Sequence, residues 1–291
     1  MNNNVITLKL SSSQEDQLFQ TFYNNKAKAP AYARWQLRCE NCVITCYESG
    51  KTVFQGQDAE VYASPFMQEP SVPLQAEITD TDILPQAGSD EVGTGDYFGP
   101  VCVCATIVDD TTYPLIQKLG IRDSKQLTDE QIRKIGPELL QALPHSLLIL
   151  DNASYNRVHE NNNMNAIKAK LHNKAYLNLN RKCGLPRLIT IDQFTPENTY
   201  YRYLKDEPQV IRGINFETKA EDRYPSVGAA SVIARYAFLV KWDEMEKQYD
   251  MTFHKGGGAQ ADRSGTEFIR RYGRENLEKV AKLHFKNTER L

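Results

Sequence analysis

Short runs of alternating apolar and polar residues predict strands in the first part of the chain, at residues 5–10, 32–38, 42–48 and 52–55. After the first run, apolar positions recur with a helical period, which predicts a helix entered through Ser13, with Asp16 three residues later. A second helix is expected at about residues 58–64. These elements predict a compact α+β module over residues 1–64.

The next stretch, residues 65–85, is polar and acidic and has little periodicity. It is interrupted by Pro65, Pro70, Pro73 and Pro85. Proline disfavours both the helix interior and the strand ladder, so such a stretch is typical of a tether between domains. We therefore expect a linker over residues 65–85.

Beyond the linker, strands and helices are mixed along the chain, which is the pattern of an α/β domain. Strands are predicted at residues 101–108, 147–150, 188–192 and 211–216. Helices are predicted at residues 128–143, 165–181 and 226–249, the first of them with a capping box from Thr128 to Gln131. Residues 86–291 are thus expected to form one α/β domain.

Composition limits the function classes. With 291 residues, of which 41% are hydrophobic, the chain can fill a substantial core. A net charge of −2 argues against a strongly cationic protein, so any contact with nucleic acid must come from local clusters. No apolar run reaches membrane length, the first residues lack the layout of a signal peptide, and no apolar stripe suggests an oligomer. We expect a cytoplasmic monomer.

Six cysteines are present, at Cys39, Cys42, Cys46, Cys102, Cys104 and Cys183. They are too sparse for a disulfide framework in a chain of this length. The single CxxC pair has no second pair and no nearby histidine with which to complete a zinc site. Reduced thiols are therefore expected.

Acidic residues lie where predicted strands end. Asp90 and Glu91 follow residues 87–89, Asp192 ends the strand at 188–192, and Glu221 comes shortly after the last strand. Loops at strand ends converge in open α/β sheets, so these four acids are expected to meet in one crevice. Asp151 also ends a predicted strand and remains an alternative, and any single acid of this kind can instead cap a helix or turn.

Carboxylates without histidine or cysteine at matching positions favour Mg²⁺ or Mn²⁺ over zinc. Two such ions about 4 Å apart can activate water on one side of a phosphodiester and stabilise the leaving oxygen on the other. When no metal is bound, the acids repel one another, so at least one is expected to be protonated. The pattern indicates phosphodiester hydrolysis.

The segment Gly88-Ser89-Asp90-Glu91-Val92-Gly93-Thr94-Gly95-Asp96-Tyr97-Phe98-Gly99-Pro100 closely resembles the signature of bacterial ribonuclease HIII. Further blocks agree in the same order: Arg122-Asp123-Ser124-Lys125-Gln126-Leu127, Gly228-Ala229-Ala230-Ser231-Val232-Ile233-Ala234-Arg235 and Ala281-Lys282-Leu283-His284-Phe285-Lys286-Asn287-Thr288. The resemblance covers residues 87–291.

This resemblance implies a ribonuclease H-like α/β catalytic domain that hydrolyses the RNA strand of RNA–DNA hybrids, leaving 5′-phosphate and 3′-hydroxyl ends. It implies a metal-binding quartet of Asp90, Glu91, Asp192 and Glu221, and it disfavours Asp151. It also implies that the first module is the small TATA-box-binding-protein-like domain that helps to grip the hybrid. That module carries more acids than bases, so its grip must be local.

Two alternatives stay open. A ribonuclease HII-type enzyme would incise at single ribonucleotides embedded in DNA, but the HII group has an arginine where this chain has Thr94 and an aspartate where it has Glu221. A hybrid-binding module without catalysis would have no reason to collect four acids that repel one another. Thr94 and Glu221, together with the presence of the first module, favour the HIII type over the HII type.

A nuclease specific for RNA must sense the 2′-hydroxyl. The triplet Gly93-Thr94-Gly95 lets the backbone approach a ribose without obstruction, although the same triplet alone is also typical of a tight turn. It does not predict a dinucleotide site, because the third glycine is Gly99 and no helix follows it.

Other candidate substrate contacts depend on weaker patterns. Ser124 and Lys125 precede a helix and are expected to hold a backbone phosphate, and Lys219 is expected to neutralise the scissile phosphate. Ordinary solvation or a surface ion pair is the alternative for each. A polar helix face with Asn165, Lys168, His172 and Asn173 either follows the DNA strand or is simply solvated.

Overall fold

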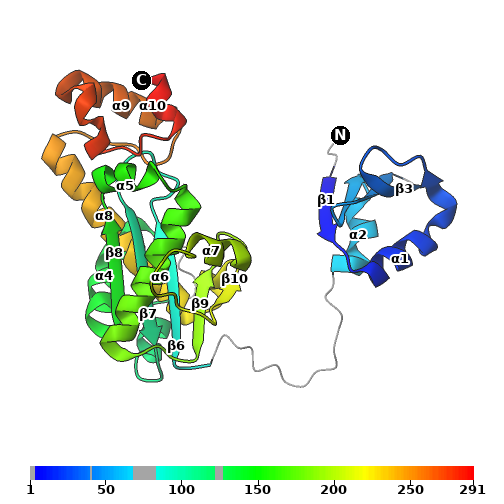
Figure 1. Cartoon of the computed structure of the whole chain (residues 1–291), viewed down its shortest axis with the longest axis horizontal. Coiled ribbons are helices and arrows are strands. Elements are labelled where there is room, and N and C mark those ends of the chain that lie inside the picture. The colour runs from blue at the N-terminus through cyan, green and yellow to red at the C-terminus, as the bar shows by residue number, and fades with distance from the viewer. Residues whose placement is uncertain (1–3, 40, 68–82, 122–126) are drawn as a thin grey trace. The chain divides into compact units, whose positions relative to one another are not determined.

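The chain is described by a computed structural model that covers residues 4–39, 41–67, 83–121 and 127–291. It divides into two compact units, Met1–Glu77 and Ile78–Leu291 (Figure 1).

The first unit is an antiparallel sheet with two helices. The strands are β1 (Asn4–Lys9), β2 (Lys26–Ala27), β3 (Ala33–Cys39), β4 (Cys42–Tyr47) and β5 (Lys51–Gly56), in the order β1-β5-β4-β3-β2. The helices are α1 (Ser12–Thr21) and α2 (Ala59–Met67), and a short 3-10 turn spans Tyr23–Asn25. A small core that includes Leu18, Leu37, Ile44 and Phe54 joins helix and sheet. The predicted α+β module is confirmed.

The start of the first helix was mispredicted. Its N-cap is Ser11, whose side chain accepts a hydrogen bond from the Gln14 backbone amide, while the Gln14 side chain accepts one from the Ser11 amide. The reciprocal pair of Ser11 and Gln14 satisfies two backbone donors at the start of the helix. The second helix continues past residue 64 to Met67. Residues 68–82, most of the predicted linker, lie outside the described residues, so the linker stays a prediction.

The second unit contains one mixed sheet in the order β10-β9-β6-β7-β8. Its strands are β6 (Gln86–Val92), β7 (Val101–Val108), β8 (His145–Leu150), β9 (Leu188–Asp192) and β10 (Asn215–Glu217). β7 is antiparallel to both β6 and β8, whereas β6, β9 and β10 run parallel to one another. The carboxyl ends of these three parallel strands therefore meet at one edge of the sheet.

Helices cover both faces of this sheet, as Figure 1 shows. All eight residues of β7 are buried. Val101, Val103 and Ala105 belong to the core layer shared with α6 (Met164–Cys183), whereas Cys102 and Cys104 belong to the layer shared with α4 (Asp129–Ala142) and α8 (Pro225–Tyr249). Because successive side chains of a strand point to opposite faces, a strand covered on both sides reads as a continuous apolar run.

The helices predicted for this unit are confirmed as α4, α6 and α8, and the Thr128–Gln131 capping box is present. The predicted strand at residues 211–216 is shorter in the structure. Gly213 has a φ of +72°, outside the range of a strand, and pairing begins only at Asn215. The remaining helical segments are α3 (Tyr113–Lys118), α5 (Asn152–His159), α7 (Glu197–Tyr203), η4 (Ala220–Asp222), α9 (Ala259–Tyr272), η5 (Arg274–Lys279) and α10 (Lys286–Arg290).

Two expectations from composition can be compared with the structure. All six cysteines are free thiols, as predicted. Cys39 and Cys42 lie opposite each other on the neighbouring strands β3 and β4, and they too are free. Within the described ranges, no helix combines the length and the apolar character that a membrane crossing requires.

Candidate active site

The four predicted acids come together at the carboxyl edge of the parallel strands. Asp90 and Glu91 lie inside β6 rather than after it, which corrects the expectation that they follow a strand. Asp192 is the last residue of β9, one position beyond the Ser89–Ile191 pair that ends the β6–β9 ladder. Glu221 lies in the 3-10 turn η4 that follows β10.

These four side chains line one cavity of about 280 Å³. The rest of its wall consists of Ile132 from α4 together with Ser231, Val232 and Arg235 from α8. Asp90 and Glu221 are buried, at 8% and 6% exposure. The predicted convergence is therefore present, in a cavity with acids at half of its lining residues.

Burial and mutual repulsion perturb two of the acids. Burial, the neighbouring Glu91 carboxylate and Asp192 raise the pKa of Asp90 well above its usual value. Burial and the nearby Glu221 carboxylate raise the pKa of Asp192 to about 6. The Ala220 amide, which donates a hydrogen bond to Asp192 Oδ1 at 2.9 Å, lowers this pKa but does not outweigh the other two effects. Without a cation, the folded site thus favours the protonated forms of Asp90 and Asp192, and a bound cation would favour their charged forms instead.

Glu91 has partners of its own on α6. Lys168 Nζ lies 2.6 Å from Glu91 Oε1, and His172 Nε2 lies 2.9 Å from Glu91 Oε2. Burial raises the pKa of Glu91, but the hydrogen bond with His172 and the charge of Lys168 outweigh this effect and the pKa is lowered. The protein therefore compensates the charge of Glu91 with two partners on α6.

This contact corrects the prediction for the polar face of α6. Lys168, His172 and Asn173 are buried and Asn165 is half-buried, so most of this face is not solvated. Asn173 donates to the Gln209 carbonyl at 2.8 Å and accepts from the Ile211 amide at 2.9 Å, which holds the segment before β10. Lys168 and His172 are four residues apart and share one side of a helix, a signal that could have pointed to a common partner.

The donor set suits Mg²⁺ or Mn²⁺, because the cavity offers carboxylate oxygens from Asp90, Glu91, Asp192 and Glu221. Among the described residues, no three His, Cys, Asp or Glu side chains are already arranged as a metal site. The carboxylates would have to turn toward a cation, which would also have to replace the protons that the raised pKa values of Asp90 and Asp192 favour.

The Gly93-Thr94-Gly95 segment follows β6 directly. Gly93 has a φ of +93°, and a Cβ there would lie 2.2 Å from the Pro100 carbonyl oxygen, so only glycine fits. A Cβ at Gly95 would meet no atom within 4 Å. Gly93 is therefore required by the fold, whereas the open space at Gly95 leaves room for a ligand.

The loop that continues from this segment, residues 96–99, is held by hydrogen bonds from Lys282, Asn152 and Gly256. The fully buried Lys282 donates from Nζ to the carbonyl oxygens of Asp96 at 2.8 Å and Gly99 at 2.5 Å. The Gly99 carbonyl also accepts from Asn152 Nδ2 at 2.9 Å. The Gly256 amide donates to Asp96 Oδ1 at 2.6 Å. The predicted substrate loop is thus anchored just beyond Gly95.

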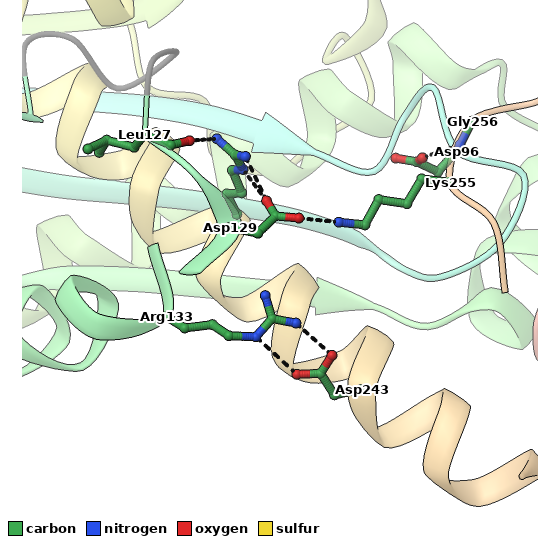
Figure 2. A network of polar contacts seen from close by, with 8 residues as sticks. Asp96, Leu127, Asp129, Arg133, Asp243, Lys255 and Gly256 are labelled. Carbon is green, nitrogen blue, oxygen red and sulfur yellow. Dashed lines mark hydrogen bonds and ion pairs between the residues drawn. The ribbon is translucent and has the colours of Figure 1, made fainter. Parts of the chain in front are cut away.

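A second polar network fixes the start of α4 and is shown in Figure 2. Arg235, from the cavity wall, donates to the Leu127 carbonyl at 2.9 Å and to Asp129 Oδ1 at 2.6 Å. Lys255 donates to Asp129 Oδ2 at 2.6 Å, and Arg133 binds Asp243 on α8. Ser124 and Lys125 lie outside the described residues, but Leu127, two residues later, is held beside the cavity by Arg235.

Two other predicted residues lie away from the cavity wall. Lys219 is exposed, two residues before Glu221, and does not line the cavity. Asp151 is the N-cap of α5 and accepts a hydrogen bond from the Ser154 amide at 2.8 Å. The capping alternative is therefore the correct one for Asp151.

Comparison with known proteins agrees with this geometry. A family model described as Ribonuclease HII matches residues 87–288, and one described as a domain of unknown function (DUF3378) matches residues 4–77. Ribonuclease HIII of Bacillus cereus is 40% identical over an alignment of 305 positions, gaps included, and this alignment covers 100% of this chain and 98% of the relative. Bst-RNase HIII in complex with Mn²⁺ superimposes with a TM-score of 0.72 at 37% identity, covering 98% of this chain and 97% of that one. Aquifex aeolicus RNase H3, at 22% identity and a TM-score of 0.58, shares the fold.

Proposed function

Because the chain belongs to the ribonuclease HIII family, it hydrolyses the RNA strand of RNA–DNA hybrids, and we propose that the carboxylates of Asp90, Glu91, Asp192 and Glu221 are its catalytic groups. The observation that carries this proposal is that four acids from three separate segments, β6, β9 and η4, line one cavity at the edge of the sheet. A structural role would not require four acids to share one cavity, because burial and repulsion make this arrangement unfavourable.

The same four residues would hold Mg²⁺ or Mn²⁺. When bound, two divalent ions supply Lewis acidity to the attacking water and to the leaving oxygen of the phosphodiester. Asp90 and Asp192 must lose their protons before they can act as ligands, since their pKa values are raised. Glu91 is already ionised and oriented by Lys168 and His172.

The substrate contacts follow from the loops around the cavity. We assign Gly93, Thr94 and Gly95 to recognition of the 2′-hydroxyl, supported by the open space above Gly95 and by the anchoring of the next residues through Lys282. We assign Ser124, Lys125 and Lys219 to phosphate contacts, on their sequence pattern alone.

The first unit is assigned to gripping the hybrid, in keeping with the small domain that the family carries at this end. The cytoplasmic location and the monomeric state expected from the sequence remain predictions.

The decisive experiment compares two labelled duplexes, a continuous RNA–DNA hybrid and a DNA duplex with a single ribonucleotide. Each is incubated with wild type, Asp90→Asn and Asp151→Asn, in Mg²⁺, in Mn²⁺ and in EDTA. We expect metal-dependent cutting of the hybrid with 5′-phosphate products, loss of cutting in Asp90→Asn and normal cutting in Asp151→Asn.

Two results would contradict the proposal. Cutting by Asp90→Asn at the wild-type rate would show that the site is assigned wrongly. Equal or preferred cutting at the single ribonucleotide would place the enzyme with the HII type instead.

A further inference from the structure

We propose that Lys168 is a positioning residue that takes the place of a divalent cation at Glu91 while the active site is without metal, and that it is displaced from Glu91 when metal binds. This inference rests on the proposed function of the quartet. It predicts that Lys168 stabilises the metal-free protein and weakens the binding of the metal.

The first observation is the geometry of the contact. Lys168 Nζ lies 2.6 Å from Glu91 Oε1, and each of the two side chains is only 10% exposed. Glu91 is one of the cavity-lining acids, so the ammonium group of Lys168, which is not itself in the cavity wall, is held by a carboxylate of the site that a cation would enter. An exposed ion pair contributes little to stability, but a buried pair leaves an uncompensated charge when one partner is removed.

The second observation is that the other oxygen of Glu91 is fixed independently. His172 Nε2 lies 2.9 Å from Oε2, and His172 Nδ1 lies 2.8 Å from Ser89 Oγ. His172 is completely buried. The imidazole therefore orients the carboxylate, which leaves Oε1, the oxygen that binds Lys168, as the one that can change partners.

The third observation is the surroundings of the ammonium group. Lys168 Nζ lies 4.0 Å from the centroid of the Phe194 ring, which also stacks on His172 at 5.4 Å between ring centroids. A cation is stabilised over an aromatic face, and it keeps that contact if its link to a carboxylate is broken. Phe194 thus offers Lys168 a partner that does not depend on Glu91.

These contacts imply competition between two cations for one carboxylate oxygen. A divalent ion that approaches Oε1 is repelled by the ammonium group, and the repulsion is strong because the site is buried. Binding of the ion must therefore break the Lys168–Glu91 pair. The stabilisation that Lys168 gives the protein is then present without metal and largely absent with it.

The experiment uses the full chain and compares wild type, Lys168→Met and Lys170→Met. Methionine keeps most of the stem length and removes the charge. Lys170 lies on the same helix and pairs with Glu207 at 3.4 Å from a more exposed position, which makes it a matched control. Urea unfolding midpoints are measured in EDTA and in saturating MnCl₂, and Mn²⁺ dissociation constants are measured by calorimetry.

We expect Lys168→Met to unfold at lower urea than wild type in EDTA, and this deficit to shrink by at least half in Mn²⁺. Its Mn²⁺ dissociation constant should be at least threefold lower than that of wild type. Lys170→Met should match wild type in every measurement. A deficit of equal size with and without Mn²⁺, or Mn²⁺ binding that is unchanged or weaker, would overturn the proposal.

A second variant covers the case in which Lys168→Met does not fold. Lys168→Arg keeps the cation, so its Mn²⁺ dissociation constant should stay within twofold of wild type. Tighter binding of Mn²⁺ by Lys168→Arg would contradict competition through charge. If wild type itself shows no Mn²⁺ binding, the metal site fails and the inference fails with it, a result that differs from Mn²⁺ binding that is insensitive to Lys168.

Discussion

Replacing Asp192 by asparagine should abolish hydrolysis and, at the same time, stabilise the metal-free protein. Burial and the Glu221 carboxylate raise the pKa of Asp192 to about 6, which means that the folded state disfavours its charged form. Asparagine removes the charge but keeps an oxygen that can accept the hydrogen bond from the Ala220 amide.

The size of the gain follows from the pKa shift. A shift from 3.8 to about 6 corresponds to about 3 kcal/mol between the two protonation states, and partial exposure of Asp192 to solvent reduces this to about 1–2 kcal/mol. The folded state binds the proton more tightly than the unfolded chain does, so the penalty is absent below the unfolded pKa and complete above the folded one. The gain should therefore appear above about pH 6 and vanish near about pH 4.

The assay is urea unfolding in EDTA at about pH 8 and about pH 4. The chain has two tryptophans, so a Trp35→Phe background leaves Trp242, which is buried in the second unit, as the reporter. Asp151→Asn is the control, since Asp151 caps α5 and asparagine is an equally good cap.

Two outcomes would refute the reasoning. If Asp192→Asn is no more stable than wild type at about pH 8, the charged form of Asp192 is not disfavoured by the fold. If the gain is the same at both pH values, it does not come from the ionisation of Asp192.

Three further substitutions test the loops and the packing. Gly95→Ala should leave stability unchanged, because its Cβ meets nothing within 4 Å, yet raise the KM for the hybrid about tenfold; an unchanged KM would exclude close approach of the ribose. Gly88→Ala should lower the free energy of unfolding by about 1–3 kcal/mol, because the new Cβ lies 2.3 Å from the Val227 backbone nitrogen; urea unfolding at the wild-type midpoint would show that β6 and α8 can separate freely. Lys282→Met should cost about 2 kcal/mol and raise amide exchange in the loop at residues 96–99, because the Asp96 carbonyl loses a buried donor, and wild-type exchange would argue against this anchoring.

Much of the architecture was predictable because it depends on local patterns. The apolar run at residues 101–108 predicted the strand β7, and the Thr128–Gln131 capping box marked the start of α4. Both depend on residues within a few positions of one another, so neither needs knowledge of the rest of the chain. The start of α1 was missed because three serines in a row offer competing caps, and the choice of Ser11 depends on how Gln14 folds back.

The candidate site, too, could be predicted only in part from the sequence. That acids follow apolar strands is visible in the sequence, but Asp151 and Asp192 share this pattern and differ in role. The sheet order decides between them: β9 pairs directly with β6, whereas β8 is separated from β6 by β7. Asp151 therefore does not come from a strand beside the one that carries Asp90, and its carboxylate caps α5 instead.

The partners of Glu91 were hidden for a related reason. Lys168 and His172 are polar residues on a helix with little amphipathic pattern, and the sequence left open whether their face follows the DNA strand or is simply solvated. Only the packing of α6 against the sheet buries them beside Glu91. The sequence by itself determined which elements form and which acids are available, because these depend on neighbouring residues. Tertiary structure alone decided which charges meet, because strand order and helix packing bring together residues that are far apart in the chain.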